Sequence, residues 1–242
     1  DFRLLDYQQT AMQSCFKLSI KGQAPVAFEL NMPGRHNALN ALAAIVVAHE
    51  LGVALPAILQ ALQKFAGVGR RLQCHGYYNM SHRRQVTVYD DYGHHPREIE
   101  VTVAALRAAF PDKKLCMVFQ PHRYTRTHEL FDYFVTVLSS VDCLLLLPVY
   151  TAGEAVIEGA ESKDLHDAIN LLQADSCCLV TATSLLENLE LQLENKDLLV
   201  MQGAGNGIAV ARRHTVYVIK NAALHKRGEF NRKVSKHSEK QK

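Results

Sequence analysis

The sequence lacks any stretch that approaches the roughly 20 consecutive apolar residues needed to cross a bilayer. Its first residues contain no basic segment followed by an apolar one, so we expect no export signal there and a cytoplasmic protein. An initiator Met is absent too, and we expect the sequence to be a segment of a longer chain. With 48% hydrophobic and 21% charged residues, the composition is typical of a globular domain in water.

Closely spaced cysteine pairs are also missing, because none of the six cysteines has C-x-x-C spacing. The cysteines stand in apolar segments, which is typical of reduced core residues in a cytoplasmic protein. A redox role for the neighbours Cys177 and Cys178 is the minor alternative.

An excess of positive charge is lacking outside the C-terminus. Residues 212–242 contain ten Lys and Arg against two Glu, whereas the whole chain has a net charge of only +3. The body is therefore net acidic and is not typical of a nucleic-acid-binding protein. We expect residues 213–242 to form a poorly ordered basic tail, and any contact with nucleic acid would come from there.

Short apolar segments alternate with amphipathic ones from about Gln73 onward. The predicted strands are 86–89, 115–119, 143–147, 177–180 and 198–201, and the predicted helices are 96–109, 127–138, 163–172 and 185–193. This alternation predicts an α/β fold with a mostly parallel sheet and helices on both faces. In such sheets ligands bind beyond the carboxyl ends of the strands.

A different pattern precedes this region. Strands are predicted at 15–20 and 26–30, followed by a mostly buried helix at 38–51 that ends at Gly52, and by a second helix at 56–64 with Pro56 in its first turn.

Two segments combine residue types found in nucleotide sites. Gly34-Arg35-His36-Asn37 opens a predicted helix, with Asn40 one turn later. Asn37 either caps the helix or, with Asn40, presents its amide to an adenine. The segment Gly67 to Gln73 contains two adjacent arginines, which are either solvated or reach phosphate oxygens from a domain junction.

The segment Asp90-Asp91-Tyr92-Gly93-His94-His95-Pro96 lies between a predicted strand and a predicted helix. Three interpretations are open. Asp91 or His94 caps the helix, or the imidazoles bind zinc, or an acidic side chain accepts hydrogen bonds from ribose hydroxyls. We favour the third, because no additional His or Cys stands at a spacing that supports a zinc site.

The segment Phe119-Gln120-Pro121-His122-Arg123-Tyr124-Thr125-Arg126-Thr127 follows the next predicted strand. One helical turn separates Arg123 from Arg126, so both guanidinium groups would lie on one face. Such a pair at a strand end forms a carboxylate clamp, and two solvated surface arginines are the alternative. A last segment, Gly203 to Gly207, imitates a dinucleotide loop but lacks its third glycine, so we expect a tight strand-to-helix turn.

Together these segments resemble the muramyl ligases, and within that family the branch that adds L-alanine. The matching segments, in order, are G-R-H-N-A-L-N-A-L-A-A (34–44), F-A-G-V-G-R-R-L-Q (65–73), D-D-Y-G-H-H-P (90–96), F-Q-P-H-R-Y-T-R-T (119–127), Y-T-A-G-E (150–154) and G-A-G-N (203–206). Each match alone is modest, but the order and spacing run across nearly the whole chain to about Asn206.

The resemblance implies a division into known domains and a known reaction. Residues 1–69 would end the central ATPase domain, and residues 70–212 would form the C-terminal, Rossmann-like domain that binds the amino acid. The family uses ATP and Mg²⁺ to convert the carboxylate of UDP-N-acetylmuramate into an acyl phosphate. The amine of L-alanine then attacks, which gives an amide, ADP and phosphate in the synthesis of peptidoglycan precursors.

Roles for individual residues follow from the same resemblance. The nucleotide would be contacted by His36, Asn37, Asn40, Arg71 and one of Asp90 or Asp91. Tyr92, His94, Arg123 and Arg126 would form the L-alanine pocket, with the arginines holding the carboxylate and so orienting the amine. His94 is the candidate to accept the proton of the amine. No metal ligand is expected among the residues of this chain.

The resemblance is incomplete in one respect that concerns activity. No G-x-x-x-x-G-K-[ST] segment occurs, and a UDP-sugar domain is missing as well. The phosphate loop, its lysine and the carboxylate that holds Mg²⁺ are therefore lacking, and we predict that this chain alone has no ligase activity. The missing domains would have to come from elsewhere, for example from a separate chain.

Two alternatives remain open. The nearest is the family branch that recycles a tripeptide onto the same sugar nucleotide, which Tyr92-Gly93 and the R-Y-T-R run disfavour. The other is a non-catalytic remnant or a subunit that supplies only the amino-acid site.

Overall fold

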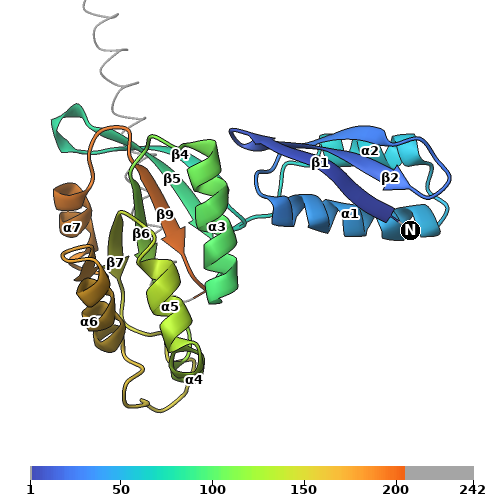
Figure 1. Ribbon diagram of the computed structural model, residues 1–242. Coiled ribbons are helices and arrows are strands. Elements are labelled where there is room, and N and C mark those ends of the chain that lie inside the picture. The colour runs from blue at the N-terminus through green and yellow to red at the C-terminus, as the bar shows by residue number, and fades with distance from the viewer. Residues whose placement is uncertain (1, 205–242) are drawn as a thin grey trace, which may run out of the picture. The chain divides into compact units, whose positions relative to one another are not determined.

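The computed structural model describes residues 2–204 of the 242-residue chain. The predicted basic tail (213–242) and most of the predicted turn at Gly203 to Gly207 lie outside the described residues. The described chain divides into two compact units (Figure 1). The first unit comprises residues 2–73 and 95–113, and the second comprises residues 74–94 and 114–204.

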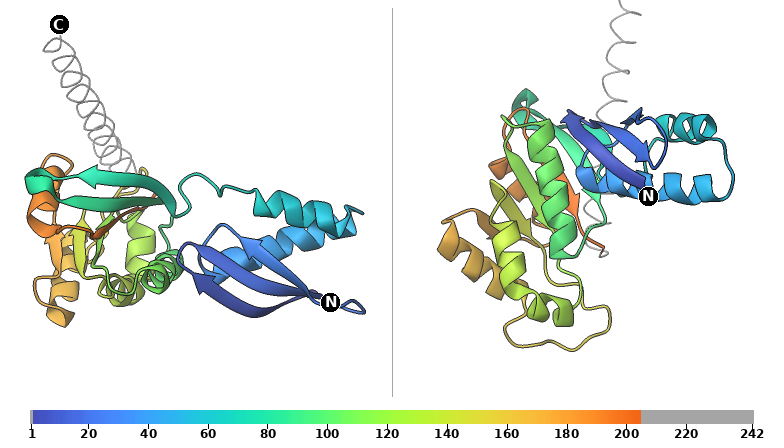
Figure 2. Two further views of the ribbon diagram at one scale, coloured as in Figure 1. Left: turned by 90° about the horizontal axis from the view of Figure 1, so that it is seen from above. Right: turned by 45° about the vertical axis from the view of Figure 1, so that its right-hand side comes forward.

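The first unit is a small antiparallel sheet with helices. Its elements are β1 (Phe2–Thr10), β2 (Gln13–Ile20), β3 (Val26–Leu30), α1 (Arg35–Glu50), α2 (Leu55–Gln63) and α3 (Pro96–Ala109). The strand order is β1-β2-β3. Along β2, Phe16, Leu18 and Ile20 are buried whereas Cys15 and Lys17 are exposed, so the helices cover one face of the sheet (Figure 2).

Strand β1 was not predicted, and its burial explains why. Every one of its residues is either exposed or half-buried, so the sequence shows no run of apolar residues at alternate positions. The pairing with β2 is also irregular between Leu5 and Gln8, which interrupts the alternation.

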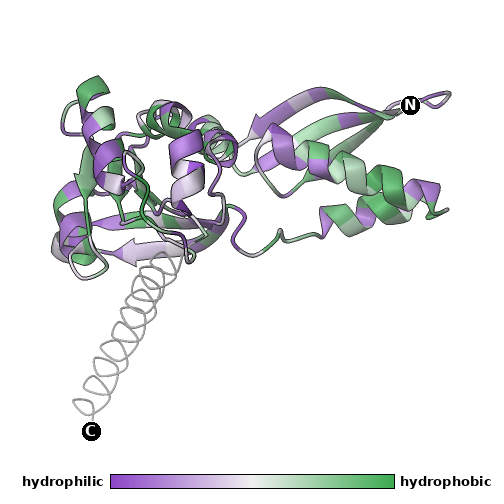
Figure 3. Cartoon of the chain, turned by 90° about the horizontal axis from the view of Figure 1, so that it is seen from below, coloured by the Kyte–Doolittle hydropathy of each residue, from purple (hydrophilic) through white to green (hydrophobic). Residues whose placement is uncertain are grey.

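Helix α1 ends as predicted but is less buried than predicted. Gly52 follows its last turn with a φ of +82°, a conformation that favours glycine. Ala38, Ala41 and Ile45 are buried against the sheet, but Leu39, Val47 and Leu51 are 42%, 60% and 78% exposed. The expectation of a mostly buried helix is therefore wrong within this unit, and Figure 3 shows how apolar the helix nevertheless is.

The entry to α1 depends on Gly34, which has a φ of +91°. A Cβ atom there would lie 2.5 Å from Cε1 of His36. The side chain of Gln9 fixes the same turn, because its Oε1 accepts from the backbone N–H of Gly34 at 2.9 Å. The Nε2 of Gln9 donates to the backbone carbonyl of Ala105 at 2.9 Å, which ties β1 and α1 to α3.

The second unit is a six-stranded sheet in the order β4-β5-β9-β6-β7-β8. Its elements are β4 (Gln73–Asn79), a 3-10 turn (Ser81–Arg83), β5 (Gln85–Asp91), β6 (Leu115–Phe119), α4 (Tyr124–Glu129), α5 (Phe131–Leu138), β7 (Cys143–Leu146), α6 (Ser162–Leu172), β8 (Cys177–Leu179), α7 (Leu185–Gln192) and β9 (Leu198–Gln202). The five strands from β5 to β8 in this order are mutually parallel.

Helices cover both faces of this sheet. The buried residues Leu185 and Leu189 of α7 belong to the same core cluster as Val118 of β6. The next residue of that strand, Phe119, points to the opposite face and contacts Phe134 of α5, with ring centroids 5.8 Å apart. The predicted fold class, a mostly parallel α/β sheet covered on both faces, is confirmed.

Two details of the second unit differ from prediction. The helix predicted at 127–138 is two helices, α4 and α5, that break at Leu130, where φ is −115°. Strand β4 was not predicted, because as an edge strand it has a single buried residue, Tyr78, and contains Gly76 with a φ of +86°.

The cysteines are all free, and their burial divides them into groups. Cys116, Cys143 and Cys177 are buried as predicted, whereas Cys15 and Cys74 are exposed and the prediction is wrong for them. Burial raises the pKa of Cys177 to about 12. A thiol with such a high pKa is a poor nucleophile at neutral pH, which weighs against a redox role for the Cys177-Cys178 pair.

Candidate functional site

The candidate amino-acid site lies within the second unit, where β5, β6 and β7 end. These strands end at Asp91, Phe119 and Leu146, and the segments that follow them contain the predicted pocket residues. The three strand ends lie at the lower end of this unit in Figure 1. A bridge between His122 and Tyr150 joins the segment after β6 to the segment after β7. The structure thus brings together residues that the sequence separates by 20 or more positions.

The turn after β5 is held by a buried glutamine that the sequence reasoning missed. Gln202, the last residue of β9, is fully buried, and its Nε2 donates to Oδ1 of Asp91 at 3.0 Å and to the carbonyl of Gly93 at 2.9 Å. The N–H of Gly93 donates to the same Asp91 oxygen at 2.7 Å. These bonds fix the turn that carries Tyr92 and His94.

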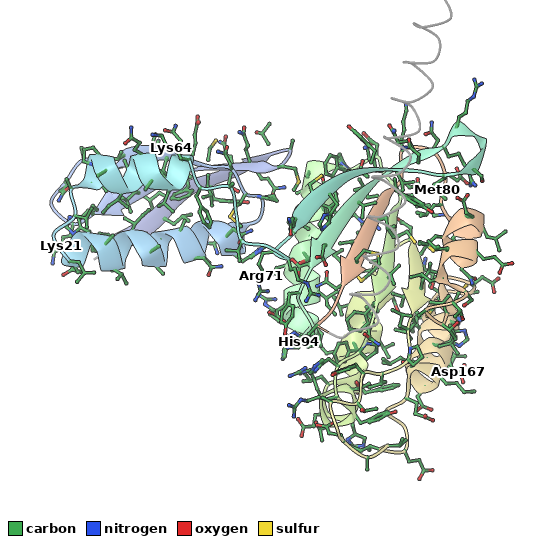
Figure 4. All side chains as sticks on the ribbon, turned by 180° about the vertical axis from the view of Figure 1, so that it is seen from behind. Lys21, Lys64, Arg71, Met80, His94 and Asp167 are labelled. Carbon is green, nitrogen blue, oxygen red and sulfur yellow. The ribbon has the colours of Figure 1, made fainter. Side chains whose placement is uncertain are left out.

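A row of rings connects that turn to the neighbouring segments. The ring centroids of Tyr92 and His94 are 5.5 Å apart, those of His94 and His122 are 5.5 Å apart, and those of His122 and Tyr150 are 5.2 Å apart. Figure 4 labels His94 at the end of its strand. Two of the predicted pocket residues therefore meet the arginine-containing segment through His122, which had not been assigned a role.

Arg123 occupies a constrained backbone position at the start of α4. Its φ is +73°, which is uncommon for a residue other than glycine. The N–H of Arg123 donates to the carbonyl of Tyr150 at 2.8 Å, and the hydroxyl of Thr127 donates to its carbonyl at 2.9 Å. Its side chain is 51% exposed. Backbone bonds on both sides thus fix a residue whose guanidinium stays accessible.

Arg126 lies within α4, one turn from Arg123. Its Nη1 donates to the backbone carbonyl of His122 at 3.1 Å and lies 3.4 Å from Nδ1 of that imidazole. Arg126 thus contacts one member of the row of rings, and a carboxylate clamp formed by Arg123 and Arg126 stays a prediction.

Glu154, in the segment after β7, completes the cluster and was not assigned a role from the sequence. Its carboxylate accepts from the N–H and the hydroxyl of Thr125, at 3.1 and 2.8 Å, and lies 3.5 Å from Nη1 of Arg123. The bond from the Thr125 N–H, its hydroxyl and the charge of Arg123 lower the pKa of Glu154, so this side chain is a carboxylate at neutral pH.

The surroundings of His122 favour the neutral form of its imidazole. Its partial burial lowers its pKa, and the nearby His94, Arg126 and Arg123 lower it further. We predict that NMR titration gives His122 a pKa below its usual value of about 6.5, and that Arg126→Ala raises it. Because the unfolded chain takes up this proton more readily, His122 should cost stability as the pH falls through about 6.5. An unchanged pKa in the Arg126→Ala protein would contradict this electrostatic account.

The predicted nucleotide residues divide between the two units. In the first, Asn40 is exposed at the start of α1, whereas the Nδ2 of Asn37 donates to the carbonyl of Pro33 at 2.7 Å. No side chain caps α1, so the capping interpretation of Asn37 is wrong. Arg71 forms an exposed ion pair with Glu98 at 3.1 Å.

The other two predicted nucleotide residues, Asp90 and Asp91, are buried at the end of β5. An oxygen of Asp90 lies 3.7 Å from Nε2 of His75. The cap of α3 is His95, whose Nδ1 accepts from the N–H of Arg97 and which forms a capping box with Glu98. The expectation that Asp91 or His94 caps this helix is thus wrong, and the ribose contact stays a prediction.

Within residues 2–204, no group of three His, Cys, Asp or Glu side chains gathers in a way that could hold a metal ion. Within the same residues, no helix is long and apolar enough to span a membrane.

Comparison with known proteins identifies the chain. The family described as "Mur ligase, glutamate ligase domain" matches residues 70–205. UDP-N-acetylmuramate-alanine ligase from Thermotoga maritima is similar in structure, with a TM-score of 0.72 and 26% identity, over 91% of this chain and 46% of that one. The mostly parallel sheet, with helices on both faces, has the fold of an α/β ligase domain. This chain belongs to the Mur ligase family, and it contains that family's C-terminal domain.

Two further structures share the fold. A murein peptide ligase from Psychrobacter arcticus has a TM-score of 0.60 and 21% identity, over 88% of this chain and 43% of that one. The MurF ligase of Thermotoga maritima, in complex with ADP, has a TM-score of 0.62 and 14% identity, over 92% of this chain and 47% of that one. The chain therefore spans less than half the length of each of these proteins.

Proposed function

We propose that this chain supplies the amino-acid site of an ATP-dependent ligase that adds L-alanine to UDP-N-acetylmuramate, in the cytoplasmic synthesis of peptidoglycan precursors. Residues 1–69 would be the end of the central ATPase domain, and residues 70–212 the C-terminal domain. The observation that carries the proposal is the strand-end cluster, in which His94 contacts His122, Arg126 donates to the carbonyl of His122, and Arg123 follows His122 directly in the chain.

The cluster suits a small amino acid. The α-carboxylate would bind the two guanidinium groups, which hydrogen-bond carboxylates in a fixed geometry. Tyr92 and His94 would line the space for the side chain and the amine. Binding of the carboxylate would then orient the amine toward the activated partner, so that the contribution to rate is mainly positional. His94 is our candidate to accept the proton that the amine releases.

ATP and Mg²⁺ would be bound jointly by residues of this chain and by the domains that this chain does not contain. When bound, ATP supplies the phosphoryl group that activates the carboxylate of the sugar nucleotide. From this chain, the residues that fit a nucleotide are His36, Asn37 and Asn40 at the start of α1, and Arg71, whose side chain is 47% exposed. The described residues offer no phosphate loop or metal-ligand group, so the cradle for the phosphates and Mg²⁺ would come from outside this chain.

The exposed apolar face of α1 supports the proposal that a further part of the ATPase fold contacts this chain. Leu39, Val47 and Leu51 fall on one face of the helix, at multiples of four residues, and all are exposed. A helix that is apolar all round is normally buried on all sides. We propose that the remaining part of the ATPase fold, present in the longer relatives, covers this face, whether it belongs to the same polypeptide or to a separate chain.

The proposal is tested by assaying ligase activity with UDP-N-acetylmuramate, L-alanine, ATP and Mg²⁺. The 242-residue chain alone should give no ADP and no amide product, because the phosphate cradle is missing. Joined to, or mixed with, domains that supply the phosphate cradle and the UDP-sugar site, the chain should form the amide, and Arg123→Ala should abolish this. Turnover by the chain alone would refute the predicted inactivity. An assembly that is equally active with and without Arg123→Ala would refute the proposed site.

A further inference from the structure

Glu154 stands out because it places a negative charge beside a proposed carboxylate clamp. Its Oε1 lies 3.5 Å from Nη1 of Arg123. That distance is an ion-pair contact slightly longer than a normal hydrogen bond. A carboxylate at this position competes with the substrate for the same guanidinium. The proposed function gives it no role, and an amino-acid pocket without Glu154 would attract carboxylates more strongly.

The position of Glu154 is fixed by bonds other than the ion pair. The N–H and hydroxyl of Thr125 both donate to its carboxylate, at 3.1 and 2.8 Å. Only 19% of the side chain is exposed, whereas Arg123 is 51% exposed. The carboxylate therefore cannot turn into solvent without losing two charge-assisted hydrogen bonds, and the arginine is the more exposed partner.

The charges of the two arginines of the proposed clamp and of Glu154 add up to a single positive charge. Arg123 and Arg126 contribute two positive charges, and Glu154 removes one of them. A neutral amino acid brings one carboxylate and one ammonium, so it has no net charge. An acidic amino acid brings a second carboxylate. The Arg123 guanidinium is already paired with Glu154, and the fixed negative charge of Glu154 would repel this second carboxylate.

We propose that Glu154 is a specificity-determining residue, which restricts the amino-acid pocket to substrates with a single carboxylate and excludes acidic amino acids. This inference rests on the proposed function, because it assumes that Arg123 binds the α-carboxylate. The selectivity arises from like-charge repulsion, which at a distance of several ångströms near a protein surface corresponds to about a tenfold change in affinity.

The test compares ligands that differ in charge but not in shape. L-asparagine and L-aspartate are nearly isosteric, and only L-aspartate has a second carboxylate. We would titrate each, with L-alanine as reference, into the ¹⁵N-labelled chain and into Glu154→Gln, and obtain Kd values by NMR. The matched control is Glu158→Gln, which removes an exposed carboxylate from the same segment. Glu154→Gln keeps the shape of the side chain and an oxygen that accepts from Thr125.

The unaltered chain should bind L-alanine and disfavour L-aspartate relative to L-asparagine. Glu154→Gln should shift that ratio toward L-aspartate by about tenfold, whereas Glu158→Gln should leave it unchanged. As a second variant, Thr125→Val removes a hydrogen bond but no charge, and should change the ratio much less than Glu154→Gln does.

Other outcomes separate this inference from the proposed function. An unchanged aspartate-to-asparagine ratio in a Glu154→Gln protein that still binds L-alanine would overturn the inference and leave the proposed site intact. A Glu154→Gln protein that loses all three ligands alike would show that Glu154 only supports the fold, which also overturns it. Failure of the unaltered chain to bind L-alanine at millimolar concentration would count against the proposed function itself, and the inference would fall with it.

Discussion

Replacing Gln202 by Leu should lower the free energy of unfolding of the second unit by about 3 kcal/mol. Two buried hydrogen bonds disappear, from Nε2 to the carboxylate of Asp91 and to the carbonyl of Gly93. The bond to the carboxylate is charge-assisted and is the larger loss. Removal of Oε1 offsets part of it, since that buried oxygen has no hydrogen-bond partner among residues 2–204.

Urea unfolding followed by far-UV circular dichroism measures this effect, with Gln173→Leu as the matched control. Gln173 is exposed at the end of α6, and its replacement should change stability by less than about 0.5 kcal/mol. Gln202→Glu should be worse than Gln202→Leu, because it places a second carboxylate against Asp91 inside the protein. A Gln202→Leu protein as stable as the unaltered chain would show that the turn after β5 is held by other contacts.

Arg123→Ala should weaken the binding of L-alanine by at least about 30-fold, or to below detection. Truncating one partner of a hydrogen-bonded charge pair that binding buries typically costs about 2–5 kcal/mol, because the other charge is left buried without its partner. The variant keeps a side chain at the same positive φ, so the backbone of α4 should be little changed. Isothermal titration calorimetry of L-alanine measures the loss.

The controls for this variant separate charge from geometry. Arg3→Ala removes an exposed arginine in the first unit and should leave binding unchanged. Arg123→Lys keeps the positive charge but loses the planar fork, and should give an intermediate affinity. Equal affinities of the unaltered chain and Arg123→Ala would rule out Arg123 as the carboxylate ligand.

The sequence predicted a candidate site because of a property of parallel sheets. Ligands bind beyond the carboxyl ends of such strands, and polar segments follow β5 and β6. The structure brings these two segments together at His94 and His122. The Y-T-A-G-E segment follows β7 at the same edge of the sheet, so the same property predicts that Glu154 lies near the other two segments.

Other contacts could not be read from the sequence. Gln202 reaches Asp91 across 111 residues, and such a pairing depends on which strands become neighbours. The sheet order places β9 directly beside β5, although they are the last and second strands of the unit. The positive φ of Arg123 could not be predicted from the sequence either. At a residue other than glycine, such a φ is imposed by the surrounding structure and not by the preference of the residue itself.

Helix α1 shows a disagreement of a different kind. Its composition predicted a mostly buried helix, whereas the described chain buries only Ala38, Ala41 and Ile45 of it. This chain covers only 46% of the Thermotoga maritima alanine ligase, which provides a physical reason for the difference if the additional fold of that protein covers the corresponding face. The apolar sequence would then have been shaped by contacts that lie outside the 242 residues.

The measurement that tests the central claim most directly is an NMR titration of the ¹⁵N-labelled chain with L-alanine. Binding at the strand ends should shift the amide signals of Gly93, Thr125 and Glu154 with a single saturation curve, and leave α1 and α2 unaffected. Shifts confined to the first unit, or no shifts at millimolar L-alanine, would contradict the conclusion that this half of the ligase fold carries the amino-acid site.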